Sequence, residues 1–557
     1  MKADRLVANV NKFLGRTTIR ISLLVISLLI LLAAAIFYGY HSAQIHILNT
    51  DQLIDNFLFS DVQSFQGALF PGSHTFLLKW PLFALGGRFS GHEVFTMLTI
   101  VVTILTATSM ALICYLVSKR NVLIAALSCL LISTTMLLTP VQVAPGRTLP
   151  VGIGMITTRN LEFIVMALVA FLMVKTQKIR SWQFWLGAVL LAMLGVSDAL
   201  FLETTLLATL IFAVLACIRK KGLDRHSFLP LGSAIVGFIF AKIIILVVNS
   251  LHITHIISSH QLSIAGSIKQ MLIQFLNSIE SIFINFGAPI FGLPQSKSLI
   301  LYLLCALVAI LACLAMGLVC RKWWRERPRS ANTALNFLFL YILAVFASLA
   351  AFIVMSNGAT ENSRYIQIIW FAGIFALAYV IARVDRRVVS LLIVGFIAIS
   401  PAVFWLCGIN SSNSLAATRT TFSVTQSDAA DVLTKERINV LVGNYWWVVP
   451  VKVSMPELTV VSIDGCNLSV GINSSLAWVH PTDAPRSAVL LNRNEILSDG
   501  SSVYINSCSE EQLQNIYGKP SDRVVLQNDS TGPITIIYIY DYDIREKLLI
   551  PKLSLAL

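Results

Sequence analysis

Long apolar runs alternate with short polar segments from near the start of the chain to about residue 407. A helix needs about 20 mostly apolar residues to cross the hydrocarbon core of a bilayer. The pattern predicts eleven membrane-spanning helices, near 19–40, 94–117, 121–140, 160–175, 183–199, 201–218, 229–250, 298–320, 334–356, 365–382 and 387–407. The fifth and sixth runs are short and joined by Ser197-Asp198, so one broken hairpin is an alternative to two helices there.

Composition supports the membrane interpretation. Hydrophobic residues make up 56% of the 557 residues, charged residues make up 12%, and the mean hydropathy is +0.77. A soluble chain of this length needs more polar surface, so most of the chain is expected in lipid. The first apolar run is too long for a signal peptide and lacks a small-residue cleavage site, so we count it as a span.

The net charge of +13 is unevenly distributed along the chain. Basic residues gather before the first span and then in every second loop, at Lys2, Arg5, Lys12, Arg16, Arg20, Lys119, Arg120, Lys175, Lys178, Arg180, Arg219, Lys220, Lys221, Arg225, Arg321, Lys322, Arg325, Arg327, Arg329, Arg383, Arg386 and Arg387. This positive-inside pattern predicts a cytoplasmic N-terminus in a bacterial inner membrane. An odd number of spans then places the segment after Cys407 outside, in the periplasm of a Gram-negative-like cell. The basic excess is thus a topology signal, and nucleic acid is not expected as a partner.

Three non-cytoplasmic segments are long. The first exported loop, 41–93, is apolar enough for residues 62–87 to form amphipathic helices at the membrane surface. The second, 251–297, contains a helical stretch near 266–285. The third is a tail that is large enough for a small domain. We therefore predict a transmembrane domain over 1–408 and a periplasmic α/β domain over 409–557.

The tail begins with a Ser/Asn/Thr-rich linker, and Ser427 is a candidate N-cap for a helix that runs to Arg437. Apolar runs of strand length follow at 438–442, 458–463, 488–491, 502–505, 523–526 and 534–540. Ser509–Tyr517 carries a Ser-x-x-Gln capping pattern and predicts a helix. The expected fold of the tail is compact α/β, with an undetermined strand order.

Nine cysteines are present, and seven of them lie in or at the ends of apolar spans, where packing is their simplest role. Cys466 and Cys508 lie in the exported tail. An oxidising compartment favours a disulfide between them, and two free buried thiols are the alternative.

Ionisable groups at membrane depth cost roughly 2.5–3.5 kcal/mol each on insertion scales, so they tend to be functional. The predicted topology gathers such residues on the outer side, at Asp51, Asp55, Asp61, Arg147, Arg159, Asn160, Asp198, Glu203, Glu361, Asn362, Ser363, Arg364 and Tyr365. Acids and arginines that converge at one level can line a polar cavity under the exported loops.

Asp51 is the sharpest candidate in this set. A carboxylate on a short tether from the first span can reach lipid head groups, where it could act as a general base on an acceptor hydroxyl or amine. The ordinary alternative is a solvated loop acid or a helix cap. That alternative is stronger for Asp61 and Asp55.

Arg159 and Arg364 each lie at the outer end of a span, and Lys79 lies between aromatic residues in the first loop. Arginine binds phosphate through a planar fork of donors. Each of the three cations has an alternative role as an interfacial anchor that snorkels to the head groups.

Two aromatic or histidine clusters are less specific. Tyr445-Trp446-Trp447 follows a buried strand in the tail and could stack on a sugar ring, although packing is the commoner role. His252, His255 and His260 have no acid or cysteine partner at zinc-site spacing, so no metal site is assigned to them.

The order and sidedness of several motifs resemble the GT-C superfamily of membrane glycosyltransferases. The matching segments are Asp51 about ten residues beyond the first span, Asp61, Phe-Pro-Gly-Ser-His at 70–74, Lys-Trp-Pro at 79–81, Ser-Asp at 197–198, and Asn-Ser-Arg-Tyr at 362–365. The exported α/β tail with Gly-Asn-Tyr-Trp at 443–446 is similar to one bacterial subgroup.

The resemblance implies a polyprenyl-phosphate sugar as donor and inversion at the anomeric carbon. It implies that Asp51 deprotonates the acceptor, that Asp61 positions the acceptor or a cation, and that Arg364, with Arg159 or Lys79, holds the departing phosphate. It also suggests substrate contacts from His74, Asp198, Glu361, Tyr365, Tyr445 and Trp446. The first loop has Asp51-Gln52 in place of the acidic pair of several members, so a divalent cation is possible but not assigned.

The expected activity is therefore sugar transfer to an envelope or lipid-linked glycan, such as lipopolysaccharide or O-antigen. A transporter or flippase of lipid-linked glycans is the main alternative, but it needs charged residues distributed through the spans. A scaffold that binds partners through its tail is a third hypothesis. A glycan polymerase or ligase usually carries its large exported part between late spans rather than in the tail.

Overall fold

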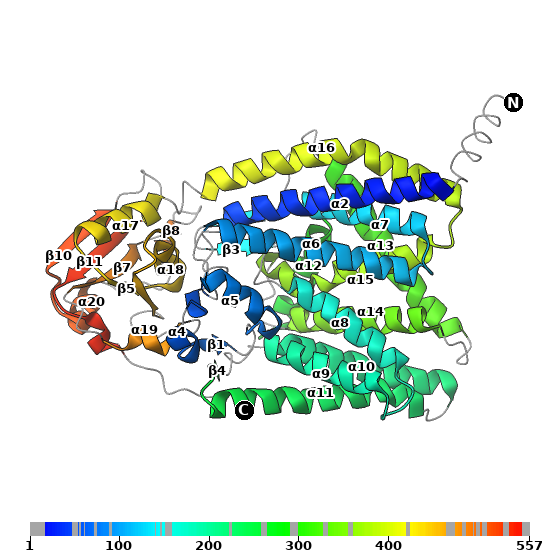
Figure 1. The fold of residues 1–557 in the computed structure, drawn as a ribbon, viewed down its shortest axis with the longest axis horizontal. Coiled ribbons are helices and arrows are strands. Elements are labelled where there is room, and N and C mark those ends of the chain that lie inside the picture. The colour runs from blue at the N-terminus through cyan, green and yellow to red at the C-terminus, as the bar shows by residue number, and fades with distance from the viewer. Residues whose placement is uncertain are drawn as a thin grey trace.

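A computed structural model describes residues 17–46, 54, 57–60, 62–71, 75–88, 92–139, 141–144, 147–150, 159–221, 225–257, 265–289, 299–326, 332–354, 360–418, 424–463, 474–481, 486–493, 495–496, 502–503, 510–526 and 534–548. A bundle of long helices makes up most of the molecule, and a sheet-containing unit lies beyond one end of it (Figure 1). Helices α4 (Val62–Gln66) and α5 (Trp80–Arg88) of the first loop lie between the two parts.

Helices form at all eleven places where the apolar runs predict a span. They are α2 (Thr17–His46), α6 (His92–Val117), α7 (Val122–Leu138), α8 (Asn160–Lys175), α9 (Trp182–Ser197), α10 (Ala199–Lys220), α11 (Arg225–Ser250), α13 (Leu299–Arg325), α14 (Thr333–Val354), α15 (Ile368–Ile381) and α16 (Arg386–Thr418). In the described part of the chain, eight helices are long and apolar enough to cross a membrane. Helices α7, α8 and α9 are shorter, at 17, 16 and 16 residues, and α15 reaches spanning length only together with the residues before it, over Ser363–Ile381. The protein is a polytopic helical membrane protein.

The fifth and sixth apolar runs form two separate helices. Asp198 divides α9 from α10 with an extended backbone, and its side chain accepts a hydrogen bond from the Leu200 N–H at 2.9 Å. An aspartate at this position satisfies one of the donors that a helix start leaves open.

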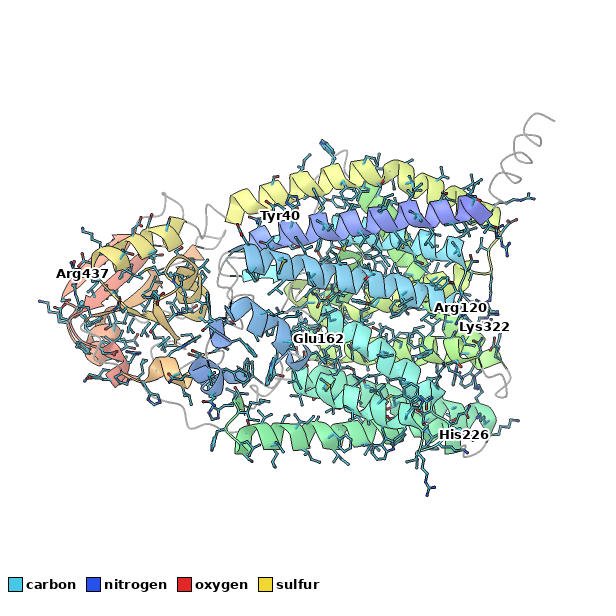
Figure 2. All side chains as sticks on the ribbon, in the orientation of Figure 1. Tyr40, Arg120, Glu162, His226, Lys322 and Arg437 are labelled. Carbon is cyan, nitrogen blue, oxygen red and sulfur yellow. The ribbon has the colours of Figure 1, made fainter. Side chains whose placement is uncertain are left out.

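The two ends of the bundle differ in charge. Figure 2 places Arg120, His226 and Lys322 at the end away from the sheet, and Glu162 and Tyr40 in the half nearer to it. The predicted basic loops thus gather at one end. At the centre, α7 is buried along nearly its whole length and α15 is equally apolar. On the outside, large apolar side chains such as Leu29, Leu314 and Leu391 are exposed, as expected of surfaces that face lipid.

The predicted helical stretch of the second loop is α12 (Ile268–Asn285), which begins at Ser267, whose hydroxyl accepts the Gln270 N–H at 3.2 Å. One face is apolar and exposed, and the other face is polar and buried, with Gln274, Ser278 and Ser281. This arrangement suits a helix with lipid on one side and a polar protein interior on the other.

The sheet of the tail has five strands in the order β10-β11-β7-β5-β6. The strands are β5 (Val440–Gly443), β6 (Thr459–Ser462), β7 (Ser487–Arg493), β10 (Asp522–Leu526) and β11 (Ile534–Tyr540). Strand β5 is parallel to β6 and β7, with Val440 opposite both Thr459 and Ser487, and β11 is antiparallel to β7 and β10. The remaining predicted strand is represented by β9 (Ser502–Val503), which pairs with β8 (Glu495–Ile496).

Helices cover the sheet on both faces. Helices α17 (Val424–Lys435) and α18 (Tyr445–Ser454) pack on one face, and α20 (Glu510–Tyr517) packs on the other. The prediction that Ser427 is an N-cap is wrong, because α17 already begins at Val424 and Ser427 lies inside it. The first face also packs against Leu58 and Phe70, so the first loop shares the hydrophobic core of the tail.

The first loop is not helical throughout 62–87. Strand β1 (Leu69–Pro71) interrupts it before the short helix η1 (Leu77–Lys79), and pairs in parallel with β4 (His255–Ile257) of the second loop. The Ala68 carbonyl accepts hydrogen bonds from the His255 N–H and the Thr254 hydroxyl, each at 3.0 Å. Two distant loops are thereby joined by main-chain hydrogen bonds.

The same loop segment also binds the tail. The Leu69 N–H donates to the Ser474 carbonyl, and the Leu476 N–H donates to the Gly67 carbonyl, each at 2.8 Å. The Trp478 indole donates to the Ser64 hydroxyl at 2.8 Å, from the short helix α19 (Leu476–Val479). We call this meeting of 64–71, 254–257 and 474–478 the loop junction.

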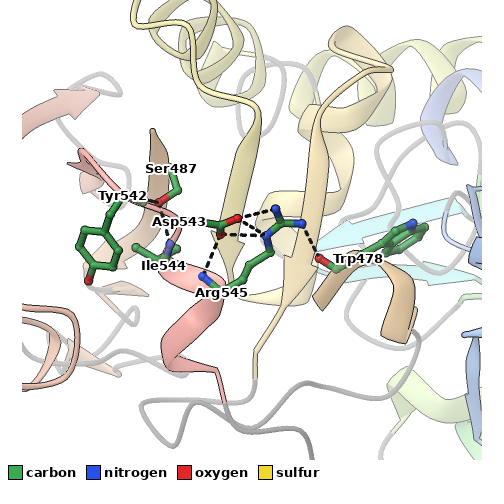
Figure 3. Close-up of polar contacts among 6 residues, drawn as sticks. All are labelled: Trp478, Ser487, Tyr542, Asp543, Ile544 and Arg545. Atoms are coloured by element: carbon green, nitrogen blue, oxygen red, sulfur yellow. Dashed lines mark hydrogen bonds and ion pairs between the residues drawn. The ribbon is translucent and has the colours of Figure 1, made fainter. Parts of the chain in front are cut away.

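A buried ion pair holds α19 against the end of the sheet (Figure 3). The Arg545 guanidinium contacts the Asp543 carboxylate at 2.6 Å, and its Nη1 donates to the Trp478 carbonyl at 3.1 Å. Both charged side chains are almost fully buried, so this contact fixes α19 relative to the chain that follows β11.

Candidate functional site

Charged side chains from four separate segments meet at the end of the bundle that faces the loop junction. We call this group the ionic cluster, and it consists of Lys79, Arg159, Glu162, Asp198, Arg364 and Tyr365. Such groups are expensive to bury in a membrane protein unless they are paired or serve a function. Their convergence makes this the candidate site.

Lys79 enters the bundle from the first loop. The Lys79 Nζ lies 2.9 Å from Glu162 Oε2, and neither side chain is exposed. The helix η1 follows Phe76, which has a left-handed backbone with φ of 43° and turns the chain inward. Its start rests on the end of α9, because the N–H groups of Thr75 and Phe76 donate to the Ser197 carbonyl at 3.0 and 3.2 Å. Lys79 is therefore a buried ion-pair partner and does not snorkel to an interface.

Arg159 lies directly before α8 and is equally buried, at 3% exposure. Its Nε and Nη2 both contact Asp198 Oδ2. The other carboxylate oxygen of Asp198 accepts the Leu200 N–H, as described above. The guanidinium carbon also lies 4.4 Å from the centroid of the Tyr365 ring, which is within the range of a cation–π contact. The edge of the Arg159 guanidinium thus contacts Asp198, and its face contacts the Tyr365 ring.

Arg364 and Tyr365 belong to the short helix η2 (Thr360–Ile366), which leads into α15. The Arg364 guanidinium lies 5.4 Å from the Tyr365 centroid, so one tyrosine contacts two arginines. Arg364 is only half-buried, unlike Arg159. Asn285 at the end of α12 holds η2 in place by donating to the Ser363 carbonyl at 3.0 Å.

The described part of the cluster contains three cationic side chains and two carboxylates, an excess of one positive charge. Arg364 is half-buried, so an anion that reached this end of the bundle would meet its guanidinium beside the other two cations. Arginine and lysine beside one another, with arginine presenting its planar fork, form the donor set that suits a phosphate group.

Buried polar groups lie along α12 and on η2, the short helix that carries Arg364. Five buried oxygens have no hydrogen-bond partner among the described residues, and they are Gln274 Oε1, Ser281 Oγ, Asn285 Oδ1, Ser363 Oγ and Gln367 Oε1. They come from the inner face of α12 and from η2 with the start of α15. Buried polar atoms are rarely left without partners, so this wall can bind water or the hydroxyl groups of a ligand.

Of the candidates that the sequence suggested, Lys79, Arg159, Asp198, Arg364 and Tyr365 come together here. Tyr445 does not, because it packs with Trp447 against the hydrophobic core on one face of the sheet. Glu203 is exposed on α10, just beyond Asp198. The residues outside the described part are Asp51, Asp55, Asp61, His74, His260, Cys466 and Cys508, and so are the side chains of Arg147, Glu361, Asn362 and Trp446.

Sequence reasoning missed Glu162, the partner of Lys79. Its signal was present, since it is a carboxylate within an apolar run, three residues after Arg159. His252 and His255 lie together, with ring centroids 6.0 Å apart. Among the described residues, no three histidine, cysteine or acidic side chains are placed to hold a metal ion.

No known protein family profile matches this chain, and no curated protein is significantly similar to it in sequence.

Proposed function

We propose that the protein is an inverting glycosyltransferase of the GT-C type in a bacterial inner membrane. It would move a sugar from a polyprenyl-phosphate donor to an envelope or lipid-linked glycan, such as lipopolysaccharide, at the periplasmic face. The observation that carries this proposal is the convergence of Lys79, Arg159 and Arg364 with two carboxylates, at the end of the bundle where the exported loops meet the tail.

The proposed reaction uses each part of the site. The acceptor oxygen or nitrogen attacks the anomeric carbon, the bond between that carbon and the phosphate oxygen breaks, and Asp51 takes the acceptor proton. Asp61 would position the acceptor or a cation. Polyprenyl phosphate leaves with an additional negative charge, which Arg364, Arg159 and Lys79 would stabilise. The polar wall of α12 and η2 offers hydrogen bonds to sugar hydroxyls.

The distribution of charge favours transfer over transport. A flippase would move a polar glycan past the centre of the bundle, but the central helices α7 and α15 are buried and apolar over their described lengths. Figure 2 places Glu162 of the ionic cluster in the half of the bundle nearer to the sheet, and Arg120 and Lys322 at the other end. A reaction at one membrane face needs only one of these ends.

The test is glycan mass spectrometry on cells that lack the gene, complemented with wild type, Asp51→Asn or Arg364→Gln at equal membrane levels. We expect loss of one defined sugar in the deletion, restored by wild type and by neither variant. Asp431→Asn, on the exposed side of α17, is the matched control and should restore the sugar. Full restoration by both site variants, or accumulation of the intact lipid-linked glycan on the cytoplasmic face, would contradict a transferase and favour a flippase.

A further inference from the structure

A second polar site lies at the opposite end of the bundle. A cavity of about 470 Å³ opens between the ends of α2, α6, α7, α15 and α16. Five basic residues line it, namely Arg20, Lys119, Arg120, Arg383 and Arg386, and no acidic residue does so in the described part of the chain. The volume falls within the range of ordinary small-ligand sites. The cavity is unrelated to the ionic cluster, because it is built from the basic loops at the other end.

The turn between α6 and α7 brings two of these cations to the cavity through an unusual backbone. Lys119 and Arg120 both have left-handed conformations, with φ of 60° and 63°. This region is unfavourable for residues other than glycine, so two in succession are uncommon. The Arg120 N–H closes the end of α6 on the Tyr115 carbonyl at 2.8 Å, and Asn121 caps α7 at the Leu123 N–H. The turn thus has a lysine followed by an arginine at two positions where glycine or asparagine would be less strained.

The far wall of the cavity is also fixed. Arg383 lies with its guanidinium carbon 4.1 Å from the centroid of the Tyr379 ring, and its Nη1 donates to the Tyr379 carbonyl at 2.6 Å. The nearby carboxylate of Asp385 accepts the Arg387 N–H at 2.9 Å and is exposed outside the cavity lining. The cavity therefore keeps its positive charge and has an arginine already held in position.

An apolar track leads away from the cavity along α2. Ile21 lines the cavity and is exposed, and Val25 and Leu29 are exposed at the following turns of the same face. A basic pocket that continues into a lipid-facing apolar strip fits a molecule with a phosphate head and a hydrocarbon tail. Basic pockets between the ends of spanning helices are suited to anionic lipid head groups.

We infer that this cavity is a binding site for the phosphate head group of an anionic phospholipid from the surrounding bilayer. Lys119, Arg120, Arg383 and Arg386 contact the phosphate, and the acyl chain lies along Ile21, Val25 and Leu29. The inference stands whether or not the protein is a glycosyltransferase.

The test uses delipidated full-length protein in neutral detergent and native mass spectrometry with added lipids. We expect one dioleoylphosphatidylglycerol or cardiolipin to be retained in preference to dioleoylphosphatidylcholine. The variant Lys119→Asn/Arg120→Asn keeps the turn, because asparagine tolerates a left-handed backbone. It should weaken binding of the anionic lipid roughly 30-fold.

The control is Arg321→Gln/Arg325→Gln, which removes the same charge from exposed positions on α13 outside the cavity lining. It should bind like wild type. Equal weakening by both variants would mean diffuse attraction by the basic end and would overturn the site. So would equal retention of the phosphatidylcholine. Binding of inorganic pyrophosphate that displaces the lipid and is as tight as the lipid itself would assign the cavity to a soluble phosphate instead.

Discussion

Arg159 and Tyr365 are stacked in the interior of the protein, with the guanidinium carbon 4.4 Å from the ring centroid, while the edge of the same guanidinium contacts Asp198. Tyr365 also lies 5.4 Å from the Arg364 guanidinium. One aromatic ring therefore contacts two arginines. Arg159 is fully buried and paired with Asp198, and Arg364 is half-buried and more accessible. Arg159 thereby fixes the ring that Arg364 contacts.

Removing Arg159 should damage folding and function to different degrees. Arg159→Met leaves a buried carboxylate at Asp198, and breaking such a pair costs about 3–5 kcal/mol. The double variant Arg159→Met/Asp198→Asn removes both charges and keeps a capping side chain at the start of α10. We expect the double variant to recover the melting temperature Tm in detergent, but not sugar transfer in complemented cells. Recovery of both would make the pair purely structural.

The Lys79–Glu162 pair should behave as a buried ion pair in the same way. Glu162→Gln leaves the Lys79 ammonium unpaired and should destabilise the fold by about 3–5 kcal/mol, and Glu162→Gln/Lys79→Met should recover most of this. Circular dichroism or a thiol-dye melt of purified protein measures the change. Lys322→Met is the matched control, because it breaks a partly exposed i,i+4 pair with Glu326, worth about 0.3–0.5 kcal/mol. Similar losses for both single variants would contradict the burial of Lys79.

Gly67→Ala should loosen the loop junction. An added Cβ would lie 2.7 Å from Ser475 Oγ and 2.8 Å from the Ala477 nitrogen, so either the loop or α19 must move. We expect faster proteolysis of the first and second loops and a lower Tm. Gly317→Ala is the control, since nothing lies within 4 Å of a Cβ there. If the two variants are equally resistant to protease, the tail does not hold the first loop in solution.

The junction should also weaken in acid. Burial and the neighbouring His252 lower the pKa of His255 below its usual value of 6.5, so the folded protein favours the neutral ring. The unfolded chain then binds more protons near pH 6, and the contribution of His255 to stability, fully present above the unfolded pKa, decreases as the pH falls below about 6.5. His255→Gln should make Tm less dependent on pH between about 5.5 and 7.5. An unchanged pH profile would place this histidine in water.

The elements of the fold follow largely from local pattern. Apolar length alone located the spanning helices, and short apolar runs located the strands of the tail sheet. Strand order did not follow, because β11 pairs with β7 and β10 through contacts that no local pattern encodes. The pairing of β1 with β4 was equally hidden, since each strand has three residues and is stable only when the two loops meet.

The candidate site was predicted only in part, again because its contacts join segments that are distant in the sequence. Arginine at the end of a span indicates either a phosphate ligand or an interfacial anchor, and the sequence cannot decide between them. The partners decide, and the Arg159–Asp198 and Lys79–Glu162 contacts join segments far apart in the chain. Glu162 was overlooked because α8 is apolar around it, although that contrast was itself the signal.

The loop junction can form only late in the synthesis of the chain. The Ser475 hydroxyl donates to the Ser64 carbonyl across 411 residues of sequence, so the first loop is synthesised long before its docking partner exists. At roughly 5–20 residues per second, the ribosome needs about 20–80 s to bridge that interval. During this period Leu58 and Phe70 have no tail to pack against, so the nascent chain is an incomplete intermediate whose first loop is not yet docked. A premature stop after α16 and before residue 475 would therefore leave every predicted span in the membrane and still yield a protein whose first loop lacks its Ser475 partner.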